Sequence, residues 1–127
     1  NELGRHLEAE NLSIGSVSHI TGIYREEILV YGEANHAGTT MMQDRKDAML
    51  ALSELALEIE LAAKEFENPD VVATMGYVKI KPNEANIIPG EAKAIIDVRT
   101  CEKEIQDKIL EKIKKIKENF FSFIFLN

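Results

Sequence analysis

The chain has few of the residues that mark special classes of protein. Its one cysteine among 127 residues, Cys101, cannot form an internal disulfide, so we expect a fold that does not need oxidation and a cytoplasmic location. No apolar run approaches the ~20 residues that span a bilayer, and we expect no membrane partner. The net charge of −7 argues against nucleic acid, because phosphate binding requires a basic face. The glycines also lack the spacings of phosphate-binding loops.

Apolar periodicity predicts strands and helices in alternation along the chain. Alternating residues favour strands over 13–24 and 28–34, with the polar residues 25–27 as a hairpin turn between them. Spacings of three and four predict a helix from about 45 to 66, with Asp44 as its N-cap. Further strands are predicted over 71–80 and 91–99, and a second helix over 102–118. The chain therefore has the length and pattern of one domain.

The order of these elements predicts an α+β fold. Two helices would cover one face of an antiparallel sheet of about four strands, in a ferredoxin-like (split βαβ) sandwich. The phenylalanine-rich end, residues 120–126, is compatible with a closing strand, a tail packed on the core or a segment that packs elsewhere. The edge strands of an open sheet have unpaired backbone N–H and C=O groups that another element has to cover. Pairing with a second copy of the chain is one way to cover them.

The loop between the second strand and the first helix contains groups that can do chemistry. Residues 32–40, GEANHAGTT, hold an imidazole, an amide and two hydroxyls between glycines. His36 either packs at the strand end or faces a ligand, and the flanking glycines allow a ligand to approach the backbone closely. His6 and His19 form no ligand-spaced pair with His36, so we expect no metal site built by this segment alone.

A second pair of polar residues flanks the strand predicted over 91–99. The amide of Asn86 and the guanidinium of Arg99 can together bind a carboxylate, because the guanidinium fork offers paired donors. Alternatively, Asn86 satisfies a turn and Arg99 pairs with Asp97 or Glu102. The sequence does not decide between these two interpretations.

Three motifs in order resemble one known family. They are residues 32–40 followed by Met42, Arg45, Lys46, Asp47 and Ala48; residues 86–90, NIIPG; and residues 96–99, IDVR. Together they are similar to the lid domain of dinuclear-metal amidohydrolases and exopeptidases. The branch with the strongest likeness contains N-carbamoyl-L-amino acid amidohydrolases, allantoate amidohydrolases and β-ureidopropionases. The likeness covers about residues 2–117.

The resemblance implies a division of labour within a longer enzyme. Residues 1–12 would be a linker from a catalytic domain, 13–119 the lid and dimerisation domain, and 120–127 a tail without an assigned role. The catalytic domain would bind two divalent metal ions, zinc or manganese, and the water-activating glutamate would also lie there. We expect the 127-residue chain alone to be inactive and to bind no metal.

The same resemblance implies roles for four residues. His36 would enter the active site of the partner in a homodimer and stabilise the oxyanion formed from the substrate's carbonyl group. Asn86 and Arg99 would hold the substrate's carboxylate, and Gly90 would let the loop backbone approach the substrate. Two features depart from the family pattern: Met41 stands where proline is usual, and the phenylalanine-rich end does not match.

A function of another class remains open. A ferredoxin-like module that binds a small regulatory molecule, or only dimerises, would have the same order of strands and helices. That alternative leaves the set of His36, Asn86 and Arg99 without an explanation.

Overall fold

The computed structural model describes residues 22–67, 70–120 and 124–126. The predicted linker, residues 1–12, and most of the first predicted strand lie outside these residues. In chain order the elements are β1 (Gly22–Tyr31), the 3-10 helix η1 (Met42–Asp44), α3 (Ala48–Lys64), β2 (Val72–Lys81), β3 (Glu91–Thr100), α4 (Lys103–Glu118) and β4 (Ile124–Leu126).

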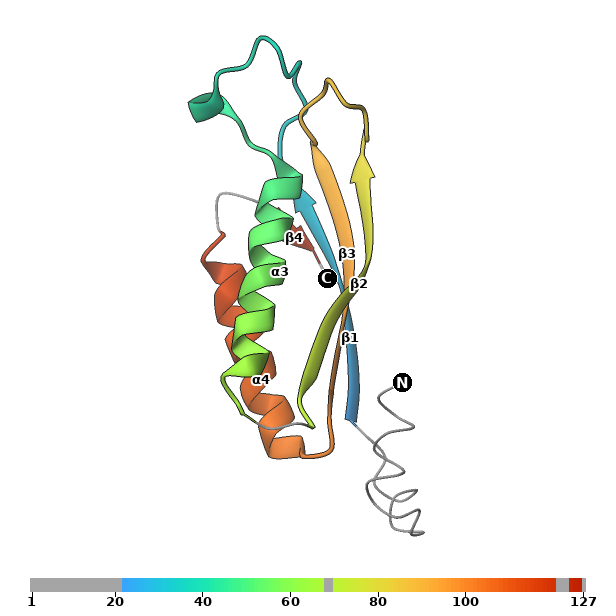
Figure 1. The fold of residues 1–127 in the computed structure, drawn as a ribbon, viewed down its shortest axis with the longest axis vertical. Coiled ribbons are helices and arrows are strands. Elements are labelled where there is room, and N and C mark those ends of the chain that lie inside the picture. Colours follow the sequence, from blue (N-terminus) through green and yellow to red (C-terminus); the bar gives the residue numbers. More distant parts are fainter. Residues whose placement is uncertain (1–21, 68–69, 121–123, 127) are drawn as a thin grey trace.

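Three ten-residue strands form the body of an antiparallel sheet. Its order is β2-β3-β1-β4, and the three-residue β4 pairs with the end of β1. Both helices lie over the same face of the sheet, and the loops after β1 and β2 meet at one end of the domain (Figure 1). The predicted α+β architecture, with two helices on one face of an antiparallel sheet, is confirmed.

The predicted hairpin turn at residues 25–27 is wrong. Strand β1 runs through these residues without a break and pairs along its whole length with β3. The charged side chains keep the alternation of a strand: Arg25 and Glu27 face away from the helices, towards Asp97 and Lys93, whereas Glu26 faces α4. Each charge has a partner of opposite sign, which removes the reason for a turn.

The first helix begins later than predicted. Asp47, and not Asp44, is the N-cap of α3, because its Oδ1 accepts hydrogen bonds from the backbone N–H groups of Met49 and Leu50. Asp44 instead lies in η1. The predicted apolar stripe of this helix is confirmed, since five of its six members are buried and the sixth, Phe66, packs against the core.

The core lies between the sheet and the two helices. The predicted inner face of β3 is fully buried, at 0% exposure for Ala92, Ala94, Ile96 and Val98. Strand β1 adds Ile28 and Val30, and α4 adds Ile109 and Ile113. Each large aliphatic side chain buried in this way contributes about 1.5–3 kcal/mol. No helix among the described residues is both long and apolar enough to cross a membrane.

A buried ion pair joins β1 to the last turn of α4. The Lys117 ammonium donates to Glu26 Oε2, and the Tyr24 hydroxyl donates to Glu26 Oε1 at 3.0 Å. The Glu26 side chain is only 5% exposed, so this pair is shielded from water. Burial, together with the hydrogen bond to Glu26, raises the pKa of Tyr24 above its ordinary value.

Candidate functional site

The loop that carries His36 is joined to the loop that carries Asn86. His36 and Ile87 form an isolated antiparallel bridge, Ala37 N–H donates to Asn86 O at 2.8 Å, and Ile88 N–H donates to Asn35 O at 2.8 Å. These bonds tie two segments about 50 residues apart into one tip at the end of the sheet. The structure thus brings His36 and Asn86 together, and both residues are exposed.

Two glycines let the backbones at this tip pack closely. A Cβ added at Gly32 would lie 2.2 Å from the carbonyl oxygen of Lys46, and one at Gly90 would lie 2.9 Å from the backbone nitrogen of Ala34. Both approaches are to main-chain atoms, which cannot move aside cheaply. Close backbone packing therefore explains why residue 90 is a glycine. The predicted contact of Gly90 with substrate stays a prediction.

The ring of His36 is held by the backbone of its own loop. The N–H of Gly38 donates to His36 Nδ1 at 2.9 Å, so Nδ1 presents its lone pair. In the neutral ring the proton therefore resides on Nε2, which becomes a hydrogen-bond donor. Gly38 also provides the space, because a Cβ there would lie 3.0 Å from His36 Cε1. The loop thus sets both the orientation and the tautomer of the imidazole.

Arg45 donates two hydrogen bonds to backbone carbonyl groups of the loop that carries His36. Its Nη2 donates to the carbonyl oxygen of Ala37 at 2.7 Å, and its Nε donates to that of Thr40 at 3.2 Å. The Thr40 hydroxyl in turn donates to His36 O at 2.8 Å. Sequence reasoning placed Arg45 only at a helix start. The one sequence signal of a role near His36 was that Arg45 belongs to the same family motif as residues 32–40.

Arg99 lies at the opposite end of the sheet from His36 and Asn86. It comes eight residues after Glu91, the first residue of β3, and a strand rises ~3.4 Å per residue, so about 27 Å separate it from the tip. Within one chain the structure does not bring Arg99 to the tip. Of the two interpretations left open by the sequence, the pairing of Arg99 with Asp97 is present in the structure.

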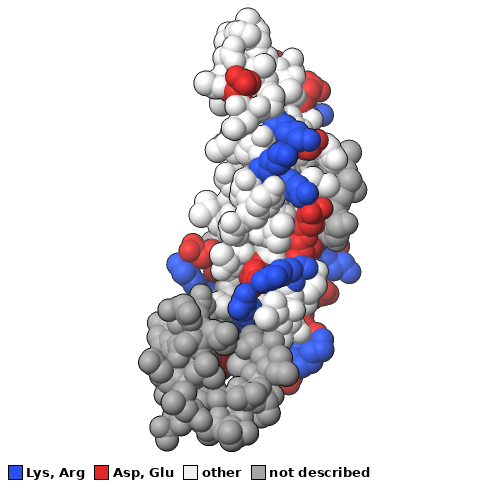
Figure 2. Space-filling model, turned by 90° about the vertical axis from the view of Figure 1, so that its right-hand side faces the viewer, with Lys and Arg blue, Asp and Glu red and all other residues white. Residues whose placement is uncertain are grey.

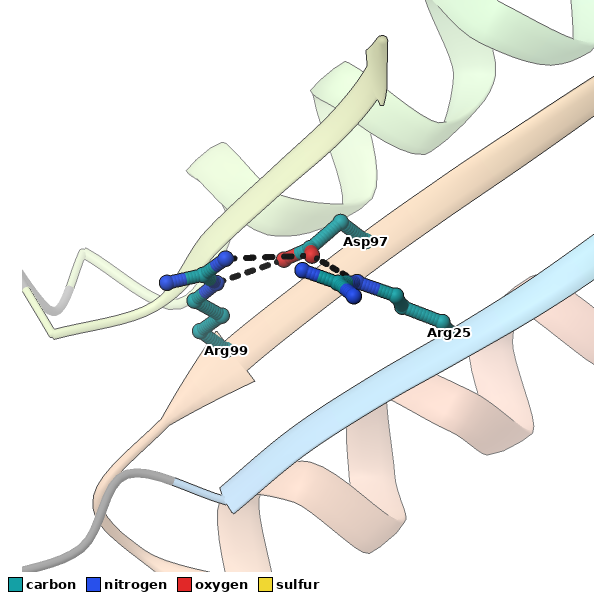
Figure 3. Close-up of polar contacts among 3 residues, drawn as sticks. All are labelled: Arg25, Asp97 and Arg99. Atoms are coloured by element: carbon teal, nitrogen blue, oxygen red, sulfur yellow. Dashed lines mark hydrogen bonds and ion pairs between the residues drawn. The ribbon is translucent and has the colours of Figure 1, made fainter. Parts of the chain in front are cut away.

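Two guanidinium groups share the carboxylate of Asp97 (Figure 3). Arg99 donates from Nε to Oδ1 at 2.7 Å and from Nη2 to Oδ2 at 3.2 Å, and Arg25 donates from Nε to Oδ2 at 2.7 Å. The hydrogen bonds from Arg99, supported by that from Arg25, hold the pKa of Asp97 below its ordinary value. The stability that Asp97 contributes is thus present above its unfolded-state pKa and is lost as the pH falls towards the lower folded-state pKa.

Arg25 is the residue at this end that sequence reasoning missed. It was interpreted as part of a hairpin turn, and its partner Asp97 is 72 residues away along the chain. No local pattern signals such a pairing.

The described residues offer no metal centre. Among them, no group of three or more His, Cys, Asp or Glu side chains could hold a metal ion. Cys101, the single cysteine of the chain, is exposed. Among the described residues, polar side chains from distant parts of the sequence meet in two places, the His36 and Asn86 tip and the Arg25, Asp97 and Arg99 cluster.

Comparison with known proteins gives the chain a family. A family profile described as a peptidase dimerisation domain matches residues 19–121. The chain is 39% identical over 114 residues to an N-carbamoyl-L-amino-acid amidohydrolase of Pseudomonas sp. (strain NS671), covering 90% of this chain and 28% of that protein. It is 40% identical over 98 residues to an allantoate amidohydrolase of Escherichia coli (strain K12), covering 77% and 24%.

Solved structures agree with these relatives. An amidase of the hydantoinase/carbamoylase family from Burkholderia phymatum superposes with a TM-score of 0.76 at 27% identity, covering 80% of this chain and 25% of that chain. The chain spans about a quarter of the length of each of these proteins. The family resemblance that the three motifs carry is confirmed. The chain belongs to the family of peptidase dimerisation domains.

Proposed function

We propose that this chain is the lid and dimerisation domain of a metal-dependent amidohydrolase. The whole enzyme would hydrolyse the C–N bond of N-carbamoyl-L-amino acids or related ureido acids. The observation that carries the proposal is the imidazole of His36, which a backbone N–H fixes as an Nε2 donor at an exposed tip. The relatives named as amidohydrolases, and the order β-α-β-β-α-β, support this function and a ferredoxin-like fold.

His36 would act on the carbonyl group that is attacked. A neutral imidazole with its proton on Nε2 can donate to the oxygen as negative charge develops there, without any reorganisation of the ring. The hydrogen bond from Gly38 N–H to the ring, and the hydrogen bond from Arg45 to the carbonyl oxygen of Ala37, keep that donor in place. The two divalent ions, zinc or manganese, and the base that activates water would belong to the catalytic domain.

Arg99 and Asn86 would bind the substrate's carboxylate from two different copies of the chain. About 27 Å separate Arg99 from the tip, too far for both to contact one small substrate within one protomer. A two-fold dimer resolves this, because each active site then receives the tip of one copy and the Arg99 end of the other. His36 and Asn86 would act in the partner's site, and Arg99 in that of its own chain.

The second copy would pack on the edge of the sheet and on α3. Strand β2 is an edge strand of the sheet, with Tyr77 at 42% and Val78 at 49% exposure. Helix α3 exposes Leu50, Leu57 and Leu61, which lie on one side of the helix, each more than half exposed. An apolar helix face beside an open strand edge is suited to pairing with a copy of itself.

The test is the replacement of His36 by alanine in the full-length enzyme. Loss of one preorganised oxyanion donor lowers kcat by about 10²–10³, so we expect a loss of that size with N-carbamoyl amino acids as substrates. Metal content, measured by elemental analysis, should not change. Turnover close to that of the wild type would contradict the role of His36.

A further inference from the structure

The backbone at the start of α3 is bonded to both loops of the tip. The carbonyl oxygen of Lys46 accepts a hydrogen bond from Glu33 N–H at 2.8 Å, and Ala48 N–H donates to the carbonyl oxygen of Pro89 at 3.0 Å. Ala48 is fully buried in the core. Arg45, which comes directly before Lys46, is therefore attached to a base that is fixed relative to both loops.

The guanidinium of Arg45 donates to two carbonyl groups of one turn. Its Nη2 lies 2.7 Å from the oxygen of Ala37, and its Nε lies 3.2 Å from that of Thr40. A planar guanidinium can hold two acceptors at once, which a lysine ammonium on a flexible stem does less well. Among the described residues Arg45 forms no ion pair with a carboxylate, and the tip end of the face shown in Figure 2 carries few charged side chains. The partners of this guanidinium are therefore the carbonyl groups of the turn.

Each residue that Arg45 holds is bonded in turn to a residue of the proposed site. The Thr40 hydroxyl donates to the carbonyl oxygen of His36 at 2.8 Å, and Ala37 N–H donates to that of Asn86 at 2.8 Å. Arg45 and Thr40 are half-buried, so water competes less for these bonds than at an exposed position. Arg45 is thus linked through one intervening residue to both His36 and Asn86.

We propose that Arg45 is a positioning residue that sets the imidazole of His36 and the amide of Asn86 together. Thr40 is a second positioning residue, which acts on His36 alone. This inference rests on the proposed function, which gives His36 the oxyanion and Asn86 the carboxylate of the substrate. It adds that one side chain controls both contacts, so its loss should affect turnover and substrate binding at the same time.

The experiment measures kcat and KM of the full-length enzyme with N-carbamoylglycine. We expect Arg45→Met to lower kcat about 30-fold, because the oxyanion donor shifts, and to raise KM about fivefold, because the amide of Asn86 shifts with it. Thr40→Val should lower kcat about tenfold and leave KM within about twofold. A merely structural role would not separate the two constants in this way.

Conservative variants and a matched control accompany these two changes. Thr40→Ser keeps the hydroxyl and should restore kcat to within about twofold of the wild type. Arg45→Lys keeps the charge but not the planar fork, so kcat should stay about tenfold low, and this variant tests the role if Arg45→Met folds poorly. Lys46→Met makes the same change at an exposed neighbour that contacts the tip through its backbone, and both constants should stay within about twofold.

Double variants identify the groups through which Arg45 and Thr40 act. In a His36→Ala background, Thr40→Val should lower kcat no further, because the group that Thr40 positions is gone. In an Asn86→Ala background, Arg45→Met should raise KM no further, for the same reason.

Three outcomes separate the claims. Wild-type kcat and KM in both Arg45 variants, together with a large loss of kcat in His36→Ala, overturn this inference and leave the proposed function standing. Full additivity in both double variants also overturns it, because the effects would then not pass through His36 and Asn86. Wild-type turnover of His36→Ala would remove the proposed function, and this inference with it.

Discussion

The hydrogen bond from Gly38 N–H to His36 Nδ1 decides what the imidazole can do. A histidine side chain that accepts through Nδ1 offers Nε2 as a donor while it is neutral. The imidazole can lie this close to residue 38 because residue 38 has no Cβ. At this scale, a change of one methyl group should alter catalysis without altering the fold.

We predict that Gly38→Ala lowers kcat of the full-length enzyme about tenfold or more, because the new Cβ would push the imidazole out of position. The matched control is Gly76→Ala in strand β2, where the nearest atom to a new Cβ lies at 3.8 Å. Steady-state kinetics and thermal denaturation check both variants. Equal loss of activity in the two, or unchanged activity in Gly38→Ala, would contradict the positioning role.

Local patterns predicted His36 and Asn86 as candidate residues, but not that they meet. The contact depends on bonds between residues 35–37 and 86–88, and no sequence period signals these. Arg25 was missed for the same reason, since its partner Asp97 lies 72 residues away. The roles of His36, Asn86, Arg99 and Gly90 in substrate binding and catalysis stay predictions.

Strand β1 shows how an element can contradict its own local sequence. Three charged residues in a row favour a turn, yet β1 runs through them because each charge meets a partner from another element. Glu26 is the extreme case, since its partner Lys117 lies 91 residues away in α4. The helices and β3 were predicted more closely, because their apolar stripes are visible along the chain.

The ion pair of Glu26 and Lys117 should therefore be important for the packing of β1 against α4. We predict that Lys117→Met lowers the free energy of unfolding of the chain by roughly 3 kcal/mol, because it leaves the buried Glu26 carboxylate without its cation. Urea denaturation measures the change.

The control for this prediction is Lys115→Met, two residues earlier in α4 and exposed. It should change the free energy of unfolding by less than about 0.5 kcal/mol. A double variant, Glu26→Leu with Lys117→Met, should recover most of the loss, because replacing both partners leaves no buried charge. Equal changes in the free energy of unfolding for the two lysine variants would show that the buried pair contributes no more than an exposed lysine.

At the scale of the whole molecule, the proposed function assigns the two ends of the domain to two different active sites. The loops after β1 and β2 lie together at one end of the sheet (Figure 1), whereas Arg99 lies eight residues into β3, near its far end. A rigid sheet about 27 Å long can serve two sites at once only if a second copy is present. Under the proposed function, dimerisation would be part of the catalytic arrangement.

We predict that Leu57→Glu with Leu61→Glu converts a dimer of this chain into a monomer, because both exposed leucines lie on the proposed α3 interface. The matched control is Glu58→Gln, an exposed polar change on the same helix, which should leave the dimer intact. Light scattering gives the mass, and circular dichroism confirms the fold. A wild-type chain that is strictly monomeric would show that the interface requires further residues.

The claim that His36 and Arg99 of different copies share one active site can be measured by mixing two inactive variants of the full-length enzyme. A dimer of one His36→Ala subunit and one Arg99→Gln subunit would hold one site with both defects and one site with none. After random subunit exchange at equal amounts, half of the dimers are mixed, so the account predicts recovery of about a quarter of wild-type activity. No recovery, with exchange verified by mass, would place both residues in the same site of one chain and contradict the account.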